Sequence, residues 1–146
     1  MIDCNIIPMT LEHFKEIESN IQTAFDSFWK PSIFEQELRN PNSKYFVAIL
    51  NNEIVGVAGI WKAIDVMHIT DIIVRKDLRR VGIGSKLLEK LIEESKNQGV
   101  TSLTLEVNAK NFSAQCLYQK YGFNILGTRK KYYNHIDDAI IMTLYF

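Results

Sequence analysis

Two glycines that are one residue apart, Gly82 and Gly84, stand where a β-rich stretch gives way to an amphipathic helix. They follow the charged segment "RKDLRR" (75–80), and leucines recur on one face of the helix after them. Glycine disfavours a helix by about 1 kcal/mol relative to alanine, so this pair indicates a demand on the backbone. A helix start has unpaired N–H groups and a partial positive charge, and glycine lets an anion approach them closely. The segment therefore predicts a pyrophosphate cradle, with a flexible turn and a solvated charge run as the alternative.

Two common phosphate-binding motifs do not fit these glycines. A Walker A loop places a lysine directly after its second glycine, whereas Gly84 is followed by Ser85. A dinucleotide-binding fingerprint needs a third glycine where this chain has Leu87, and it needs the strand to lead directly into the first glycine. Here residues 75–81 intervene. The cradle must therefore belong to another kind of site.

Hydrophobic periodicity predicts a single α/β domain over residues 1–146, in the order β-α-α-β-β-β-α-β-α-β-β. Thr10 and Asn111 are expected to cap helices, Pro31 to begin one and Gly99 to end one. The Asn51-Asn52 pair predicts a hairpin turn. The expected strands cover residues 5–9, 44–50, 53–63, 66–74, 102–107, 123–128 and 139–146.

Composition excludes several classes of function. The chain has 146 residues with 17 acidic and 17 basic side chains, so no overall charge draws it to nucleic acid or to a membrane. No signal peptide is recognisable, and no apolar run approaches the roughly 18 residues of a membrane span. The two cysteines show neither metal-ligand spacing nor a disulfide framework. We expect a cytoplasmic protein without a metal, a nucleic-acid partner or a membrane partner.

Two motifs together resemble one enzyme family. The pattern Arg79-x-x-Gly82-x-Gly84 resembles the [QR]-x-x-G-x-[GA] signature of the GNAT acetyltransferase superfamily, and a block "N-x-x-A-x-x-L-Y-x-x-x-G-F" follows from Asn111 to Phe123. The segments "LEVNAKNFSAQCLYQKYGF" and "RKKYYNHIDDAIIM" resemble the bacterial ribosomal-protein-alanine N-acetyltransferases. The resemblance covers about residues 44–146. It implies the GNAT fold: a mixed, mostly antiparallel sheet of about seven strands with a splayed parallel pair, flanked by about four helices.

The resemblance also implies where acetyl-CoA binds. In the family, the cofactor lies in the gap between the splayed strands, its pyrophosphate rests on the glycine loop, and its pantetheine arm pairs with a strand backbone. Carried onto this chain, the implied cofactor-binding residues are Ile72, Ile73, Val74, Arg79, Arg80, Val81, Gly82, Ile83, Gly84, Ser85, Asn111 and Tyr118.

The same resemblance assigns catalytic roles to two residues. Glu106 matches the family's general base, and Tyr118 matches its general acid. A protein α-amine has a pKa near 8, so a base is needed to deprotonate it at neutral pH. A solvated strand carboxylate and a core tyrosine are the respective alternatives. A backbone N–H of residues 72–74 is expected to stabilise charge on the thioester oxygen.

Acceptor-binding residues are implied with less support from the sequence. Tyr132 and Tyr133 match the family's paired tyrosines beside the acceptor amine, although exposed strand aromatics are the alternative. Trp29 lies in "FDSFWKPS" (25–32), which departs from the family's "P-W-S" element, and the loop at 134–137 is shorter than in many relatives.

Two further reactive side chains have weaker cases. Cys116 has no evident histidine partner, so it is not expected to be a nucleophile. His68 with Asp65 and Asp71 suggests a metal site, but the strand period of two places His68 on the opposite face from both aspartates. We therefore expect His68 to be a structural or surface residue.

The leading interpretation is an acetyl-CoA-dependent enzyme that acetylates the N-terminal α-amine of a ribosomal protein beginning with alanine. An acetyltransferase for a small amine, such as a polyamine, an amino acid or an aminoglycoside, is the first alternative. A non-catalytic acyl-CoA-binding module is the second. Nucleic-acid binding through residues 75–80 is the weakest, because a cofactor already explains those cations.

Overall fold

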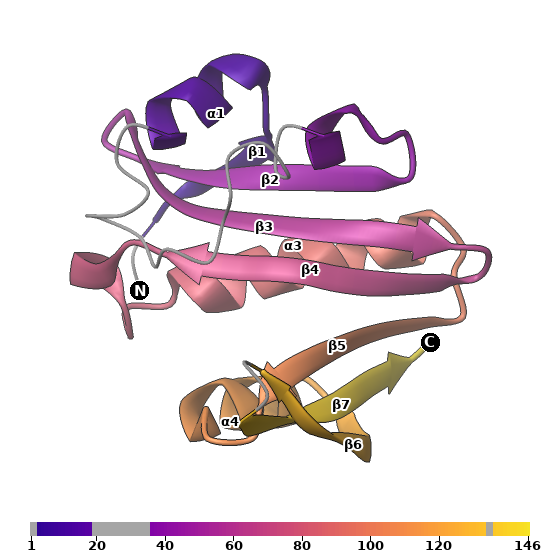
Figure 1. Ribbon diagram of the computed structural model, residues 1–146. Helices are drawn as coiled ribbons and strands as arrows, with labels where there is room; N and C mark the ends of the chain where they lie inside the picture. Colours follow the sequence, from indigo (N-terminus) through magenta and orange to yellow (C-terminus); the bar gives the residue numbers. More distant parts are fainter. Residues whose placement is uncertain (1–2, 19–35, 134–135) are drawn as a thin grey trace.

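One seven-stranded sheet organises the computed structural model, which describes residues 3–18, 36–133 and 136–146 (Figure 1). The strand order is β1-β2-β3-β4-β5-β7-β6, and every neighbouring pair is antiparallel except β4 and β5. The predicted mixed, mostly antiparallel sheet is therefore confirmed. The strands are β1 (Asn5–Pro8), β2 (Ser43–Leu50), β3 (Glu53–Ala63), β4 (Val66–Val74), β5 (Ser102–Asn108), β6 (Asn124–Tyr133) and β7 (Asp137–Tyr145).

Local signals in the sequence set most of these boundaries. Asn51 and Asn52 take left-handed φ angles of 51° and 64°, as a two-residue hairpin turn requires, and they join β2 to β3. Helix α1 (Leu11–Glu18) is capped by Thr10, whose Oγ1 accepts a hydrogen bond from the His13 N–H at 3.3 Å. Gly99, with a φ of 71°, ends α3. These three predictions are confirmed.

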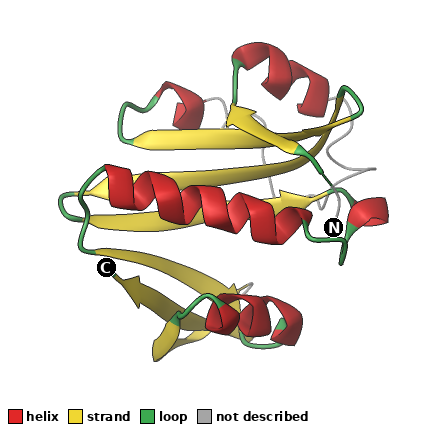
Figure 2. Ribbon diagram, turned by 180° about the vertical axis from the view of Figure 1, so that it is seen from behind, coloured by secondary structure: helices red, strands yellow, loops and turns green. Residues whose placement is uncertain are grey.

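Helices cover both faces of the sheet, and each face has its own hydrophobic cluster. Helices α3 (Ile83–Asn97) and α4 (Phe112–Lys120) lie on one face (Figure 2). They cover the larger cluster, which includes Leu87, Leu91, Leu103, Leu105 and Met142. On the opposite face, α1 contributes Phe14 and Ile17 to a smaller cluster with Tyr45, Val47, Val57 and Ile73. The sheet is thus buried on two sides over β2 and β3.

A bulge in β4 overturns one sequence prediction. The register runs Trp61↔His68, Ile60↔Ile69 and then Gly59↔Asp71, so Thr70 is an extra residue. The inserted residue shifts the alternation of side chains by one position. Asp71 therefore lies on the same face as His68, and the prediction that the two point to opposite faces was wrong.

The last two strands are longer than the sequence indicates. Strand β6 continues past the expected end at residue 128 to Tyr133, because a bulge between Arg129 and Tyr133 absorbs the irregular stretch. Within it, Lys131 has a left-handed φ of 52° and donates its backbone N–H to Asp138 Oδ1 at 2.8 Å. The carboxylate thus holds the bulge in place.

Some sequence predictions fall on residues that the structure does not describe. Trp29 and the helix start at Pro31 lie outside the described residues, although residues 36–39 are helical. Within the described ranges, no helix has both the length and the apolar character that crossing a membrane requires.

Candidate active site

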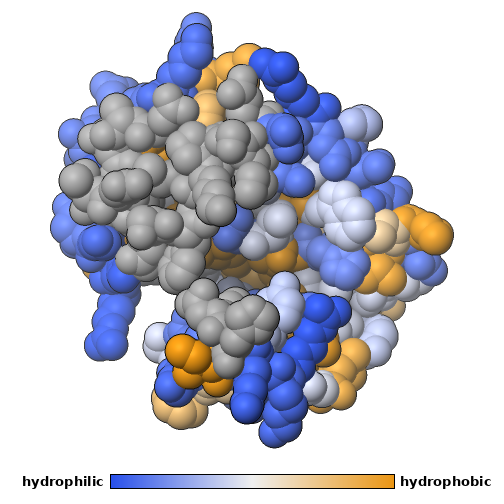
Figure 3. All heavy atoms as spheres, in the orientation of Figure 1, coloured by the Kyte–Doolittle hydropathy of each residue, from blue (hydrophilic) through white to orange (hydrophobic). Residues whose placement is uncertain are grey.

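The sheet opens into a gap between β4 and β5. These parallel strands pair only at Val66↔Ser102, Met67↔Leu103 and His68↔Thr104, after which each continues without its partner. In Figure 1 the two strands meet near one end of the sheet and separate toward the other, and Figure 3 shows the surface hollowed between the upper and lower parts of the molecule. The splayed parallel pair implied by the resemblance is present.

The open edge of β4 is a strand backbone prepared for a further partner. Ile72, Ile73 and Val74 pair with β3 on one side, while no β5 residue pairs with them on the other. Alternate N–H and C=O groups of such an edge face outward, and an extended ligand can bind them as an added strand does. The Val74 carbonyl accepts a hydrogen bond of 3.4 Å from Arg79 Nε, which draws this arginine back toward the end of the strand.

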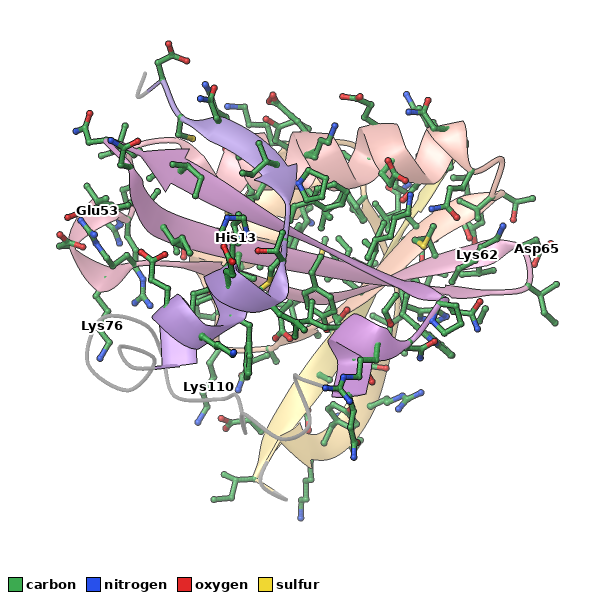
Figure 4. The ribbon with its side chains drawn as sticks, turned by 90° about the horizontal axis from the view of Figure 1, so that it is seen from above. His13, Glu53, Lys62, Asp65, Lys76 and Lys110 are labelled. Atoms are coloured by element: carbon green, nitrogen blue, oxygen red, sulfur yellow. The ribbon has the colours of Figure 1, made fainter. Side chains whose placement is uncertain are left out.

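The loop after β4 is anchored at its base. Arg75 bonds to Glu53 Oε2 at 2.9 Å and to Asp77 Oδ1 at 2.7 Å, and this pairing lowers the pKa of Asp77. The 3-10 turn η1 (Lys76–Leu78) follows. In Figure 4, Glu53 and Lys76 lie at one end of the sheet, and Lys62 and Asp65 at the other. Arg75 is therefore engaged in holding the loop. The arginines nearest the helix start in the sequence are Arg79 and Arg80.

The start of α3 has the features of an anion site. Arg80 and Gly82 take left-handed φ angles of 67° and 97°, and Gly82 is the N-cap. No described side chain caps this helix start, and no acidic residue lies in its first turn. The first N–H groups are thus available for a negatively charged ligand, and the helix dipole favours one. A pyrophosphate such as that of coenzyme A fits these groups.

The two glycines serve different needs. Gly82 needs its left-handed φ, whereas Gly84 lies in ordinary helical backbone, and a Cβ there would meet only Val74 Cγ2 at 3.8 Å. Of these two glycines, only Gly82 therefore requires a positive φ. The fold itself has room for a methyl group at Gly84.

This difference gives a prediction for stability. Gly82→Ala should lower the free energy of unfolding by about 1–2 kcal/mol, because alanine resists the left-handed conformation. Gly84→Ala should leave it unchanged or raise it by up to about 1 kcal/mol, because alanine favours the helix. Urea unfolding of both variants measures the difference. Equal destabilisation by the two substitutions would contradict the distinct roles of these glycines.

Glu106 stands on β5 beside the gap, on the face opposite α3 and α4. Its neighbours in the strand, Leu105 and Val107, point into the larger cluster, so Glu106 points the other way. One carboxylate oxygen, Oε1, lies 3.4 Å from Arg129 Nε. The other, Oε2, is buried and has no hydrogen-bond partner within the described part of the chain. A buried carboxylate oxygen without a donor is costly unless a ligand, water or substrate meets it.

His68 lies near Glu106, which sequence reasoning did not foresee. It is the last β4 residue that pairs with β5, opposite Thr104, and its ring packs against Trp61 with centroids 5.2 Å apart. Burial lowers the pKa of His68, and the Glu106 carboxylate opposes this effect. The lowered pKa of His68 favours the neutral form of its imidazole. The bulge lies two residues after His68, and nothing in the sequence marks it, so this contact could not be foreseen from the sequence.

Tyr118 lies on the opposite face of the sheet from Glu106. It packs against the larger cluster, and its ring centroid is 5.7 Å from that of Phe123. Asn111 holds the start of α4, because its Oδ1 accepts the Ala114 N–H at 3.2 Å. The cap predicted at Asn111 is confirmed, and the roles of Asn111 and Tyr118 toward the cofactor remain predictions.

A second tyrosine joins α4 to the start of α3. The Tyr121 hydroxyl donates to Glu89 Oε2 at 2.6 Å, which raises the pKa of Tyr121, and Ser85 is another hydrogen-bond partner of this hydroxyl. Nothing in the sequence indicated this link. The contact connects the predicted cofactor loop to the helix that carries Tyr118.

The predicted acceptor residues are placed only in part. Tyr132 is half exposed, and its ring lies 5.4 Å from the guanidinium of Arg129. The backbone of Tyr133 pairs with Asp137 at the end of β6.

Cys116 is exposed on α4. Among the described residues, no three His, Cys, Asp or Glu side chains gather closely enough to hold a metal ion.

Comparisons with known proteins agree with this geometry. The chain matches the acetyltransferase (GNAT) family over residues 11–123. A protein of Bacillus subtilis (strain 168), provisionally named a ribosomal protein bS18-alanine N-acetyltransferase, is 35% identical over 134 residues. The match covers 90% of this chain and 87% of that protein.

Solved structures give the same result. The ribosomal-protein-S18-alanine N-acetyltransferase from Escherichia coli superposes with a TM-score of 0.89 at 30% identity, covering 98% of this chain and 94% of that one. A GNAT family acetyltransferase from Elizabethkingia anophelis, solved with acetyl-CoA bound, has a TM-score of 0.80 at 26% identity, and each chain is covered completely. The chain therefore belongs to the GNAT acetyltransferase family and is an acetyl-CoA-dependent N-acetyltransferase.

Proposed function

We propose that this protein acetylates the N-terminal α-amine of a ribosomal protein that begins with alanine. The names of the Bacillus subtilis and Escherichia coli relatives support this acceptor. The observation that carries the proposal is the gap between β4 and β5, with Glu106 on one face of the sheet and Tyr118 on the other. An acceptor and a cofactor that meet in this gap would each face one proton-handling side chain.

The chain's own groups divide the binding of acetyl-CoA between them. The N–H groups at the start of α3, together with Arg79 and Arg80, would hold the pyrophosphate. The open edge of Ile72–Val74 would pair with the pantetheine arm, and an N–H there would stabilise negative charge developing on the acetyl oxygen. Acetyl-CoA supplies the activated acetyl thioester.

Proton transfers would then fall to Glu106 and Tyr118. Glu106 Oε2, which is buried and has no donor among the residues that the structure describes, takes a proton from the acceptor ammonium, directly or through one water. Glu106 passes this proton to solvent, and the freed amine nitrogen forms a bond to the acetyl carbon as the carbon–sulfur bond breaks. The nitrogen then loses its second proton, again through Glu106, to give the neutral amide. Tyr118 gives its hydroxyl proton to the departing sulfur, and solvent restores that proton. The proposed products are the acetylated protein and coenzyme A, in a reaction that takes place in the cytoplasm.

A panel of acceptors tests the proposed substrate. Thiol release from acetyl-CoA would be followed with peptides that begin with alanine, serine or methionine, and with polyamine, amino-acid and aminoglycoside acceptors. The expected result is the highest kcat/KM on the alanine peptide, with no reaction on the same peptide when its α-amine is blocked. Turnover confined to a small amine would replace the proposed acceptor, and tight acetyl-CoA binding without any turnover would indicate a binding module.

A further inference from the structure

Arg129 reaches Glu106 from a different strand. Glu106 is on β5 and Arg129 on β6, and β7 lies between them. The register places Glu106 beside Ile141, and Arg129 beside Ala139, two residues away on the same face of β7. Arg129 must therefore cross β7 diagonally. Ala139 carries only a methyl group, so a long side chain can pass over this position.

The contact makes the two oxygens of Glu106 different. Oε1 lies 3.4 Å from Arg129 Nε, whereas Oε2 is buried without a hydrogen-bond partner among the described residues. The Glu106 side chain is 27% exposed, and that of Arg129 is 56% exposed. One oxygen is thus restrained by a cation near the surface, and the other keeps its lone pairs for a group that enters the site.

Arg129 is itself held by its surroundings. The ring of Tyr132 lies 5.4 Å from its guanidinium, a distance typical of cation–π contacts. Tyr132 belongs to the bulge in which Lys131 is left-handed and its N–H is bound by Asp138. The irregular part of β6 therefore places the Tyr132 ring against Arg129. This contact in turn holds the Arg129 guanidinium beside the Glu106 carboxylate.

We propose that Arg129 is a positioning residue for Glu106: it restrains Oε1, so that Oε2 is directed at the acceptor amine. This inference rests on the proposed function, because it takes Glu106 as the base. It adds a role for Arg129, which lies in a segment that resembles the family but to which the resemblance assigned no function. The guanidinium would act through Glu106 and would not touch the acceptor.

An alternative is that the pair is only a surface ion pair. Such pairs add little to stability, so loss of Arg129 should leave the melting temperature nearly unchanged under either interpretation. Turnover separates the two interpretations. A positioning role requires kcat to fall while the KM for acetyl-CoA stays the same, since the cofactor loop lies on the other side of the gap.

A double-mutant cycle with Glu106 tests the proposal. Arg129→Ala should lower kcat by about 10- to 100-fold, because a catalytic group misplaced by about 1 Å can cost about 10²-fold in rate. Arg129→Lys should recover part of this loss, because it restores the charge without the planar fork. In a Glu106→Gln background, Arg129→Ala should cause no further loss. Lys130→Ala, which removes a neighbouring cation that faces Asp138 at 3.6 Å, should behave as wild type.

The outcomes separate the two proposals. If Glu106→Gln is slow but Arg129→Ala keeps the wild-type kcat, or lowers it equally in both backgrounds, the role of Arg129 is overturned while the base survives. If Glu106→Gln turns over at the wild-type rate, both proposals fail. Should Arg129→Ala not fold, Arg129→Gln replaces it in the same cycle, since glutamine removes the charge but keeps most of the side-chain length.

Discussion

Replacing Glu106 with glutamine should lower kcat by about 10²- to 10⁴-fold, the usual contribution of a general base. Glutamine has nearly the same shape, so the buried position of Oε2 is kept while the ability to accept a proton is lost. The loss should be greatest below about pH 8, where most of the α-amine is protonated, and smaller above it, where free amine is abundant. Initial rates on the alanine peptide between acidic and alkaline pH measure both effects.

A matched control accompanies this variant. Glu89→Gln removes a carboxylate of α3 that binds Tyr121 and takes no part in the proposed proton transfers, so it should keep nearly the wild-type kcat. Acetyl-CoA binding should be unaffected in both variants. A Glu106→Gln enzyme with the wild-type rate and the wild-type pH profile would remove this residue from the mechanism.

Replacing Tyr118 with phenylalanine should lower kcat by about 10²-fold, at the lower end of the range for acid–base catalysis. A thiol has a pKa near 8.5, so the thiolate leaves more readily than an alkoxide would, and an acid helps it less than the base helps the amine. Phenylalanine keeps the packing against Phe123 and the larger cluster. The free energy of unfolding should therefore change by less than about 1 kcal/mol.

The chain offers a close control for this change as well. Tyr121→Phe removes a hydroxyl from the end of the same helix, but that hydroxyl bonds to Glu89 and Ser85. Single-turnover kinetics should show a slow chemical step in Tyr118→Phe and a nearly normal one in Tyr121→Phe, with acetyl-CoA binding retained in both. A Tyr118→Phe enzyme that turns over normally would assign this tyrosine to the core alone.

Local features of the fold could be predicted from the sequence because short-range chemistry decides them. The asparagine pair between β2 and β3 takes the two left-handed conformations that its residue types allow, and Asn111 accepts the hydrogen bond expected of an N-cap. The pair of glycines indicated a demand on the backbone at the helix start, and Gly82 takes a left-handed φ there. The splayed gap was expected only through the family resemblance, because periodicity does not report where two strands part.

Long-range features escaped prediction for physical reasons. The bulge at Thr70 adds one residue without a glycine or proline to mark it, and this insertion moves Asp71 to the face of His68. The approach of Arg129 to Glu106 depends on the register of two strand pairs, and no local pattern encodes it. Lys131 adopts a left-handed conformation that lysine disfavours, because Asp138 binds its N–H.

The same gap links the catalytic and positioning roles proposed for these residues. The paired part of β4 and β5 ends at His68 and Thr104, and the edge of Ile72–Val74 and the carboxylate of Glu106 both lie beyond it. The proposed cofactor edge and the proposed base thus both depend on the place where β4 and β5 separate.

Mass spectrometry of one acetylated peptide is the most direct test of the proposed reaction. The peptide would begin with alanine and contain an internal lysine, and fragmentation after incubation with acetyl-CoA would locate the acetyl group. We predict a single acetyl group on the alanine α-amine with the wild-type enzyme and almost none with Glu106→Gln. Acetylation of the lysine side chain with the α-amine left free would contradict the assignment as an N-terminal acetyltransferase.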